Sequence, residues 1–331
     1  MASGDTVLEV KDLRTHFFTG DGVAKAVDGV SFAVRRSRTL ALVGESGCGK
    51  SVTALSIMRL VPDPPGRIVS GEVLLEGADL LRLSEREMQA VRGNRIGMVF
   101  QEPMTSLNPV FTIGNQVMES ILVHRDASKA DARRLALEML RTVRIPTPEE
   151  RMYSYPHELS GGQQQRVMIA IALACNPSVL IADEPTTALD VTIQSQILAL
   201  LADLQARFNM AVLFITHDFA VVAQTAHDVA VMYAAKIAET AEVRALFRRA
   251  LHPYTRLLFR SIPRPGAKRA RLDTIKGQVP SPLDFPPACR FHPRCPIAIE
   301  RCRVEEPLLR ELEPGHFAAC HRSEEVEELM K

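Results

Sequence analysis

Short apolar runs recur along the chain, and their pattern predicts the strands of a sheet. Residues 7–13 alternate apolar with polar positions and 26–34 form a second apolar-rich run, so we expect antiparallel strands of a half-exposed sheet there. Other runs are almost continuously apolar, which is typical of central strands in a parallel sheet. These runs are residues 39–43, 95–100, 179–182 and 211–215.

Helical periodicity fills the segments between these runs. From Ile113 to about Val143, apolar residues recur at helical spacing around a charged middle at 129–134. Pro146 and Pro148 end this pattern. We therefore expect an inserted helical subdomain over about residues 103–165.

A glycine-rich segment lies between the apolar run 39–43 and a helical pattern over 52–60. Glycines let backbone N–H groups turn inward around a phosphate chain, and the helix N-terminus adds partial positive charge. Lys50 can reach the β- and γ-phosphates, and the Ser51 hydroxyl can ligate Mg²⁺. The predicted nucleotide-binding residues are Gly44, Glu45, Ser46, Gly47, Cys48, Gly49, Lys50, Ser51 and Val52.

A second serine- and glycine-containing segment precedes the apolar helical residues 167–175. It consists of Leu159, Ser160, Gly161, Gly162 and Gln163. Free N–H groups, the helix dipole and a hydroxyl again form an anion-binding arrangement. One domain already has one phosphate loop, so this second arrangement requires a separate explanation.

Residues with polar side chains lie at the C-terminal ends of three of the predicted central strands. Asp183 and Glu184 follow a buried strand, at the edge where ligands of open α/β sheets bind. We expect Asp183 to hold Mg²⁺ and Glu184 to polarise the attacking water. Gln101 and His217 end two other strands, which favours positions near a metal-bound water and the γ-phosphate. Taken alone, each is also compatible with an ordinary strand end.

The aromatic pair Phe17 and Phe18 precedes the phosphate loop, followed by turn residues. Such a ring can stack on a purine base. The alternative is a pair of side chains that covers the sheet edge, and this alternative is stronger for Phe18.

Composition narrows the class of protein. The 331 residues are 46% apolar and 24% charged, as in ordinary globular proteins, and the net charge of +1 gives no basic face for nucleic acid. The first residues lack the pattern of a secretory signal, and the apolar stretch 167–175 is too short to span a bilayer. We expect a cytosolic chain that reaches a membrane only through partners.

Together these motifs resemble the ATP-binding subunits of ABC transporters in order and spacing. The resemblance rests on the phosphate loop 44–51, Gln101, residues 159–163, the pair 183–184, and Asp190 with His217. Finer details are similar to the D-type ATPase subunits of oligopeptide and dipeptide permeases. These details are residues 100–109, 155–160, 182–191, 252–255 and the cysteine-containing segment 289–296.

The resemblance implies a P-loop α/β fold with a RecA-like parallel core, an antiparallel β subdomain and an inserted helical subdomain. It implies a nucleotide-binding domain at 1–250, a linker at 251–280 and a small irregular cysteine-rich extension at 281–331. ATP and Mg²⁺ are the implied cofactors, with Ser51, Gln101 and Asp183 on the metal. Phe17 stands where many members of the family have tyrosine.

The resemblance also explains the second anion-binding arrangement. In this family two ATPase domains pair head to tail, so residues 159–163 contact the nucleotide of a partner, which we expect to be a similar second ATPase. Ala188, Leu189 and Asp190 form the implied D-loop. Two membrane permeases and, indirectly, an extracytoplasmic peptide-binding protein complete the implied importer, with this chain on the cytoplasmic face of the membrane.

Four of the six cysteines lie near the C-terminus: Cys289, Cys295, Cys302 and Cys320. Without a signal peptide, this grouping favours metal or redox chemistry over disulfides. The spacing is compatible with zinc or with a [4Fe–4S] cluster. The resemblance favours the cluster. We expect a structural role for it, because nothing else in the chain suggests a redox partner, and we interpret Cys48 and Cys175 as packing residues.

The sequence leaves three alternatives to a peptide importer. The chain could energise an importer for another small solute, of the nickel, opine or glutathione type. A soluble ABC ATPase acting on nucleic acid or ribosomes would require fused ATPase domains or a coiled-coil insertion, and the sequence has neither. A metal–sulfur redox protein with a secondary ATPase is the third.

Overall fold

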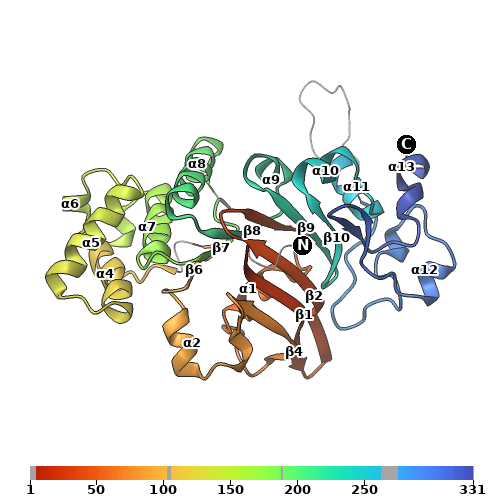
Figure 1. Cartoon of the computed structure of the whole chain (residues 1–331), viewed down its shortest axis with the longest axis horizontal. Helices are drawn as coiled ribbons and strands as arrows, with labels where there is room; N and C mark the ends of the chain where they lie inside the picture. Colours follow the sequence, from red (N-terminus) through yellow and green to blue (C-terminus); the bar gives the residue numbers. More distant parts are fainter. Residues whose placement is uncertain (1–4, 103–105, 188, 262–274, 331) are drawn as a thin grey trace. The chain divides into compact units, whose positions relative to one another are not determined.

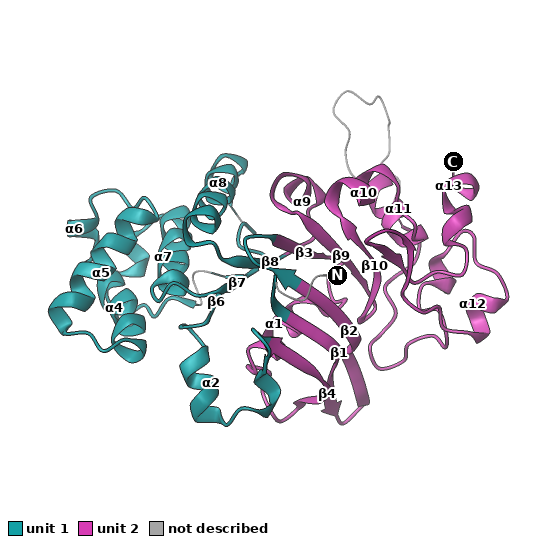
Figure 2. Cartoon of the chain, in the orientation of Figure 1, with its two compact units in different colours: residues 1–8, 34–38, 75–214 teal, residues 9–33, 39–74, 215–331 magenta. Residues whose placement is uncertain are grey.

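The computed structural model describes residues 5–102, 106–187, 189–261 and 275–330. The chain (Figure 1) divides into two compact units, which Figure 2 shows in teal and magenta. Unit 1 contains residues 1–8, 34–38 and 75–214, and unit 2 contains residues 9–33, 39–74 and 215–331. Each unit is therefore assembled from segments that are far apart in the sequence.

Two parallel strands of unit 1 position its polar strand ends. Strand β6 (Ile96–Val99) pairs in parallel with β7 (Val179–Asp183), with Val99 opposite Ala182. Every residue of β7 is buried, as its apolar sequence predicts. Since the two strands run in the same direction, the residues that follow them emerge at the same edge.

The helices of unit 1 include a packed group formed by α4, α5 and α7, which Figure 1 shows in yellow and green. The predicted helical stretch 113–143 consists of two helices, because Ser128 caps the second by accepting a hydrogen bond from the Asp131 N–H (3.1 Å). The helices are α2 (Glu85–Val91), α4 (Ile113–His124), α5 (Lys129–Thr142), α6 (Pro148–Arg151), α7 (Gly161–Leu173) and α8 (Val191–Phe208).

Unit 2 carries most of the predicted antiparallel β-region and a second group of paired strands. The first group has the order β2-β1-β4, with β1 (Thr6–Thr19), β2 (Gly22–Arg35) and β4 (Gly66–Leu75). In the second group, β3 (Thr39–Val43) pairs in parallel with β9 (Asp228–Tyr233), which pairs antiparallel with β10 (Lys236–Glu242). The sheet is therefore mixed. The remaining strands outside the C-terminal segment and the β6–β7 pair are β5 (Ala78–Asp79) and β8 (Ala211–Thr216).

The C-terminal segment joins this mixed sheet. Strand β12 (His316–Ala318) pairs with β10, and β11 (Arg310–Glu313) pairs with β12, both antiparallel. The C-terminal segment, which was predicted to be irregular, therefore contains two paired strands. The helices of unit 2 are α1 (Lys50–Ile57), α9 (Phe219–Thr225), α10 (Val243–Arg248), α11 (Pro253–Arg260), α12 (Arg301–Val304) and α13 (Val326–Leu329).

A buried aromatic cluster forms part of the core of unit 2. Tyr254 of α11 is fully buried, and its ring centroid lies 4.6 Å from that of Tyr233 and 5.5 Å from that of Phe291. Because Phe291 belongs to the C-terminal segment, that segment contributes to the same core as the strands β3 and β9. Its burial stabilises the unit by roughly 2 kcal/mol per large apolar side chain.

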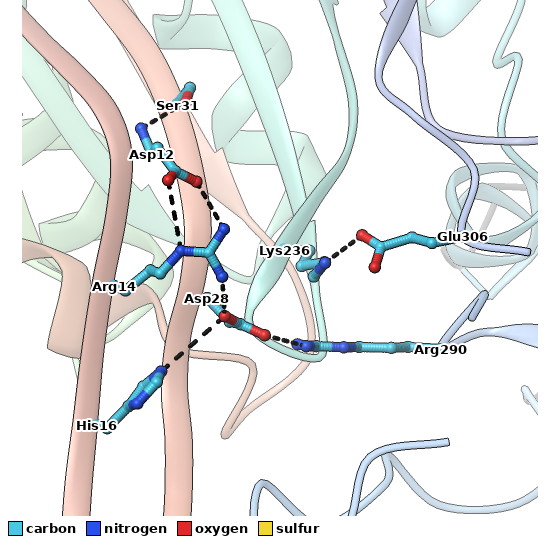
Figure 3. Close-up of polar contacts among 8 residues, drawn as sticks. All are labelled: Asp12, Arg14, His16, Asp28, Ser31, Lys236, Arg290 and Glu306. Carbon is cyan, nitrogen blue, oxygen red and sulfur yellow. Dashed lines mark hydrogen bonds and ion pairs between the residues drawn. The ribbon is translucent and has the colours of Figure 1, made fainter. Parts of the chain in front are cut away.

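Ion pairs also attach the C-terminal segment to the antiparallel strands (Figure 3). Arg290 pairs with Asp28 of β2 and donates to the Ala234 carbonyl oxygen (2.6 Å), and Lys236 pairs with Glu306. Burial alone would raise the pKa of Asp28, but the hydrogen bond and charge of Arg290 outweigh it and hold that pKa below its usual value. Asp28 is therefore ionised and paired at neutral pH.

Within the described ranges, no helix has both the length and the apolar content needed to cross a membrane.

Candidate functional site

The phosphate loop follows β3 and ends at α1, and its shape depends on glycine at two positions. Gly44 has φ +156° and Gly49 has φ +108°, which L side chains rarely adopt. A Cβ on Gly44 would lie 2.2 Å from the Met232 carbonyl oxygen, and a Cβ on Gly49 would lie 2.2 Å from that of Ala26. Backbone carbonyl groups of two other strands of unit 2 therefore lie against the loop and leave no space for a side chain at these two positions.

Lys50 lies over this loop. Its Nζ donates to the carbonyl oxygens of Gly44 (2.9 Å) and Glu45 (3.1 Å), and the residue is only 6% exposed. Ser46 and Gly47 are exposed at the tip of the loop, whereas Cys48 is buried, which raises the pKa of its thiol. Ser51 and Val52 are partly exposed in the first turn of α1. The loop therefore presents exposed backbone beside a buried ammonium group.

Two residues that sequence reasoning did not assign to the site hold Glu45. The Glu45 N–H donates to the Tyr254 hydroxyl (2.9 Å), and Arg294 forms two hydrogen bonds with the Glu45 carboxylate (2.7 and 3.0 Å). No local signal identifies them, since they lie 209 and 249 residues further along the chain. The segments around both are among those that carry the family resemblance.

The aromatic pair occupies the end of β1. Phe17 is half-buried, and a Cβ on Gly66 of β4 would meet its ring at 2.9 Å. Phe18 is 47% exposed and lies beneath the guanidinium group of Arg67, 5.8 Å from the ring centroid. Phe17 is thus packed more firmly against the protein than Phe18, and the stacking of its ring on a purine base stays a prediction.

The edge of the β6–β7 pair in unit 1 brings together the predicted catalytic groups of that unit. The Gln101 Nε2 donates to the Glu184 Oε2 at 3.5 Å, the outer limit of a hydrogen bond, and the Thr187 hydroxyl donates to the same oxygen at 2.9 Å. Glu184 has φ +46°, uncommon for a non-glycine residue, whereas the neighbouring Asp183 is 5% exposed. Sequence reasoning gave no role to Thr187, which orients the carboxylate.

The second anion-binding arrangement forms the start of α7. The Ser160 hydroxyl accepts from the Gln163 N–H (3.4 Å), and the Gln163 Oε1 accepts from the Ser160 N–H (3.1 Å), a reciprocal capping box. Ser160 and Gly161 are exposed, whereas Leu159 is 7% exposed. A Cβ on Gly162 would lie 2.7 Å from a methyl group of Ile193 in α8, so glycine is required there by packing.

The predicted D-loop precedes α8. Asp190 caps this helix by accepting from the Ile193 N–H (2.9 Å). Leu189 lies near the start of α7, with its Cδ2 3.8 Å from the Cβ position of Gly161. Ala188 lies outside the described residues.

The predicted nucleotide site draws on both units. Unit 1 contains Gln101, Asp183 and Glu184, and unit 2 contains the phosphate loop, Phe17 and His217. His217 is exposed where β8 ends, and the next residue, Asp218, caps α9. Of these groups, the structure shows a direct contact between Gln101 and Glu184 of unit 1.

The four C-terminal cysteines line one small cavity of about 10 Å³, together with histidine side chains. Burial raises the pKa of Cys295 to about 12 and that of Cys320 to about 11. Four thiols around one cavity match the donors of a four-sulfur site. However, within the part of the chain that the structure describes, no three His, Cys, Asp or Glu side chains are arranged to hold a metal ion. The predicted cluster at Cys289, Cys295, Cys302 and Cys320 is therefore not confirmed.

The sequence matches two protein families. The family described as ABC transporter matches residues 27–187, and the oligopeptide/dipeptide transporter C-terminal region matches residues 238–302. The second match includes Tyr254 and Arg294, the two residues that hold Glu45.

Similar proteins match over almost the whole chain. The chain is 56% identical over 323 residues to a probable peptide ABC transporter ATP-binding protein, y4tR, of Sinorhizobium fredii, covering 97% of this chain and 96% of that protein. It is 50% identical to the oligopeptide transport ATP-binding protein AppD of Bacillus subtilis, with 97% and 98% covered. It is 48% identical to the dipeptide transport ATP-binding protein DppD of Escherichia coli, with 95% and 96% covered.

Solved structures support the same relationship. The dimeric bacterial ABC transporter cassette MJ0796 is 30% identical, with a TM-score of 0.64, and the match covers 72% of this chain and 99% of that one. The same cassette in a post-hydrolysis state, bound to ADP and Pi, matches equally well.

Proposed function

The chain belongs to the ABC transporter ATP-binding proteins of the peptide-transport type, and we propose that it is the ATP-hydrolysing subunit of an importer for di- and oligopeptides. The observation that carries the hydrolytic role is the Glu184 carboxylate, which lies between Gln101 and Thr187 and next to the buried Asp183. The peptide substrate is supported by the printed functions of the similar proteins.

In the proposed mechanism, the N–H groups of the phosphate loop 44–52 other than that of Glu45, together with the Lys50 ammonium, bind the phosphates of ATP, and Phe17 stacks on the base. Ser51, Gln101 and Asp183 would hold Mg²⁺, directly or through water, and the ion would offset the negative charge of the phosphates. Glu184 takes a proton from the attacking water, and Thr187 keeps its carboxylate oriented. His217 contacts the γ-phosphate.

The residues at the start of α7 serve a partner's nucleotide. Ser160 and Gly161 are exposed, so a phosphate on another subunit can reach the Ser160 hydroxyl and the Gly161 N–H. Leu159, Gly162 and Gln163 complete this element, and Ala188, Leu189 and Asp190 form the adjoining D-loop. ATP drives closure because it contacts both subunits only in the closed pair.

The proposed assembly contains this chain, a similar second ATPase and two membrane permeases, with an extracytoplasmic peptide-binding protein that delivers substrate. The nucleotide-binding domain comprises residues 1–250, and the helical region of about 103–165 docks on the permeases. Residues 251–280 link it to the C-terminal extension, 281–331. The chain is located on the cytoplasmic face of the membrane.

A four-sulfur site in the C-terminal segment is the final part of the proposal. Cys289, Cys295, Cys302 and Cys320 line one cavity and are the thiols that would hold a [4Fe–4S] cluster, with zinc as the alternative. A bound cluster would supply crosslinks between these four segments of the chain. Iron, sulfide and zinc analysis after anaerobic purification decides this part: zinc without sulfide excludes the cluster.

The test of the hydrolytic role is Glu184→Gln in the assembled transporter. We expect turnover to fall by about 1,000-fold, the size of a general-base contribution, while ATP binding is retained because the phosphate contacts remain. Glu305→Gln is the matched control, since Glu305 is an exposed carboxylate paired with Arg301, outside the helical region that docks on the permeases. Normal hydrolysis by Glu184→Gln would refute the assignment of Glu184.

A further inference from the structure

Glu45 in the phosphate loop is held by a buried arginine from the C-terminal segment. Arg294 Nη1 lies 2.7 Å from Glu45 Oε2 and Nη2 lies 3.0 Å from Oε1, the bidentate geometry in which guanidinium–carboxylate pairs are strongest. The Arg294 side chain is 5% exposed, and its Nε donates to the Lys276 carbonyl oxygen (3.1 Å). Burial and this third contact leave the guanidinium group little freedom to move.

Tyr254 holds the backbone of the same loop residue. Its hydroxyl accepts a hydrogen bond from the Glu45 N–H (2.9 Å), so this N–H is directed at protein rather than at a phosphate. The Tyr254 ring is fully buried between Tyr233 and Phe291. Burial raises the pKa of Tyr254, which keeps the hydroxyl neutral. The position of the loop backbone is thus tied to the aromatic core of unit 2.

The segment that carries Arg294 is itself anchored. Phe291 is 2% exposed in the same aromatic cluster, and Arg290 pairs with the buried Asp28 (Figure 3). Arg294 therefore follows two buried anchors within four residues, in the short 3₁₀ turn His292–Arg294. Its contact with Glu45 follows from the fold of the C-terminal segment and does not depend on a flexible surface side chain.

The charge of this pair bears on ATP binding. A carboxylate in the loop repels the phosphates of ATP, because like charges a few ångströms apart are only partly screened near a protein surface. The Glu45 side chain is 28% exposed, so solvent alone does not fully screen it. The adjacent Arg294 guanidinium compensates this charge.

We propose that Arg294 and Tyr254 are positioning residues of the phosphate loop: Arg294 neutralises and orients the Glu45 carboxylate, and Tyr254 fixes the Glu45 backbone. The C-terminal segment therefore sets the affinity of this chain for ATP. This inference rests on the proposed nucleotide role of residues 44–52.

The test measures the Kd of MgATP by calorimetry on the full chain in the Glu184→Gln background. Arg294→Ala raises Kd about tenfold, the effect of a coupling of about 1.4 kcal/mol between residues in contact. Adding Glu45→Gln to Arg294→Ala restores Kd to within about threefold, since the amide carries no charge to neutralise. The control Arg301→Ala, which breaks an exposed pair with Glu305, leaves Kd unchanged.

Two conservative variants keep the test decisive if Arg294→Ala fails to fold. Arg294→Lys keeps the charge but loses the bidentate geometry, and Tyr254→Phe removes only the hydroxyl that accepts from Glu45. We expect each to raise Kd by about threefold to tenfold. Unchanged affinity in these variants, or no rescue by Glu45→Gln, overturns the inference. Failure of the unmodified chain to bind MgATP would instead refute the proposed function.

Discussion

The phosphate loop of unit 2 and the start of α7 in unit 1 share serine and glycine residues at a helix N-terminus, but their surroundings differ. The loop is enclosed by its own chain: carbonyl oxygens press on Gly44 and Gly49, and Tyr254 and Arg294 hold Glu45. The start of α7 closes its own capping box with Gln163 and leaves Ser160 and Gly161 exposed.

This difference indicates two roles for one kind of helix start. A loop that is fixed by distant parts of its own chain is preorganised to bind a ligand without a partner. An exposed, self-capped helix start keeps its dipole and the N–H groups outside its capping box available to a ligand carried by another subunit. Local sequence does not separate these roles, since both segments are predicted to bind anions.

The largest expected effect concerns the attachment of the C-terminal segment that completes the loop. Asp28→Asn leaves the Arg290 charge buried without its carboxylate, which costs about 3 kcal/mol in the free energy of unfolding. Urea unfolding at pH 7 measures this loss. Glu305→Gln, which weakens an exposed pair with Arg301, is the control and should change stability by less than about 0.5 kcal/mol. Equal stability of the two variants would mean that the segment is not held as described.

A smaller effect is expected from the enclosure of the loop itself. Gly44→Ala forces a Cβ toward the Met232 carbonyl oxygen and the Cys48 Sγ, and we expect ATP affinity to fall by about 100-fold, or 2.7 kcal/mol. Gly47→Ala is the matched control, because its Cβ would meet nothing within 4 Å and only its φ of +79° is unfavourable. Calorimetric titration with MgATP compares them, and equal affinities would contradict the enclosure.

The smallest expected effect is a difference in stability between alanine variants at the two glycines of α7. Gly162→Ala places a methyl group 2.7 Å from Ile193, so we expect a loss of about 1 kcal/mol in stability from this overpacking. Gly161→Ala meets only Leu189 at 3.8 Å and should be neutral or slightly stabilising, because alanine favours helix. Thermal unfolding measures both variants. A destabilised Gly161→Ala would show that the helix start is enclosed like the loop.

The sequence predicts the parts of this site that depend on local pattern. Continuous apolar runs predict β3 and β7, and parallel pairing brings Gln101 beside Glu184 at one sheet edge. The break between α4 and α5 has a local cap at Ser128, which periodicity alone does not reveal.

Other parts depend on long-range packing. Tyr254 and Arg294 approach the loop only because α11 and the C-terminal segment fold onto β9 and β10, and no residue near the loop indicates them. The pairing of β12 with β10 is likewise set by tertiary packing, and it gives regular structure to part of the predicted irregular extension.

The division of roles between the two helix starts is tested by comparing Lys50→Ala with Ser160→Ala in the full chain. Calorimetry should show that Lys50→Ala weakens MgATP binding by about 100-fold, because a charge-assisted phosphate contact is lost. Ser160→Ala should leave affinity within about twofold while it lowers turnover in the assembled transporter, since its helix start serves the partner's nucleotide. If Ser160→Ala weakened the chain's own ATP binding as strongly as Lys50→Ala, the division of roles between the two helix starts would be wrong.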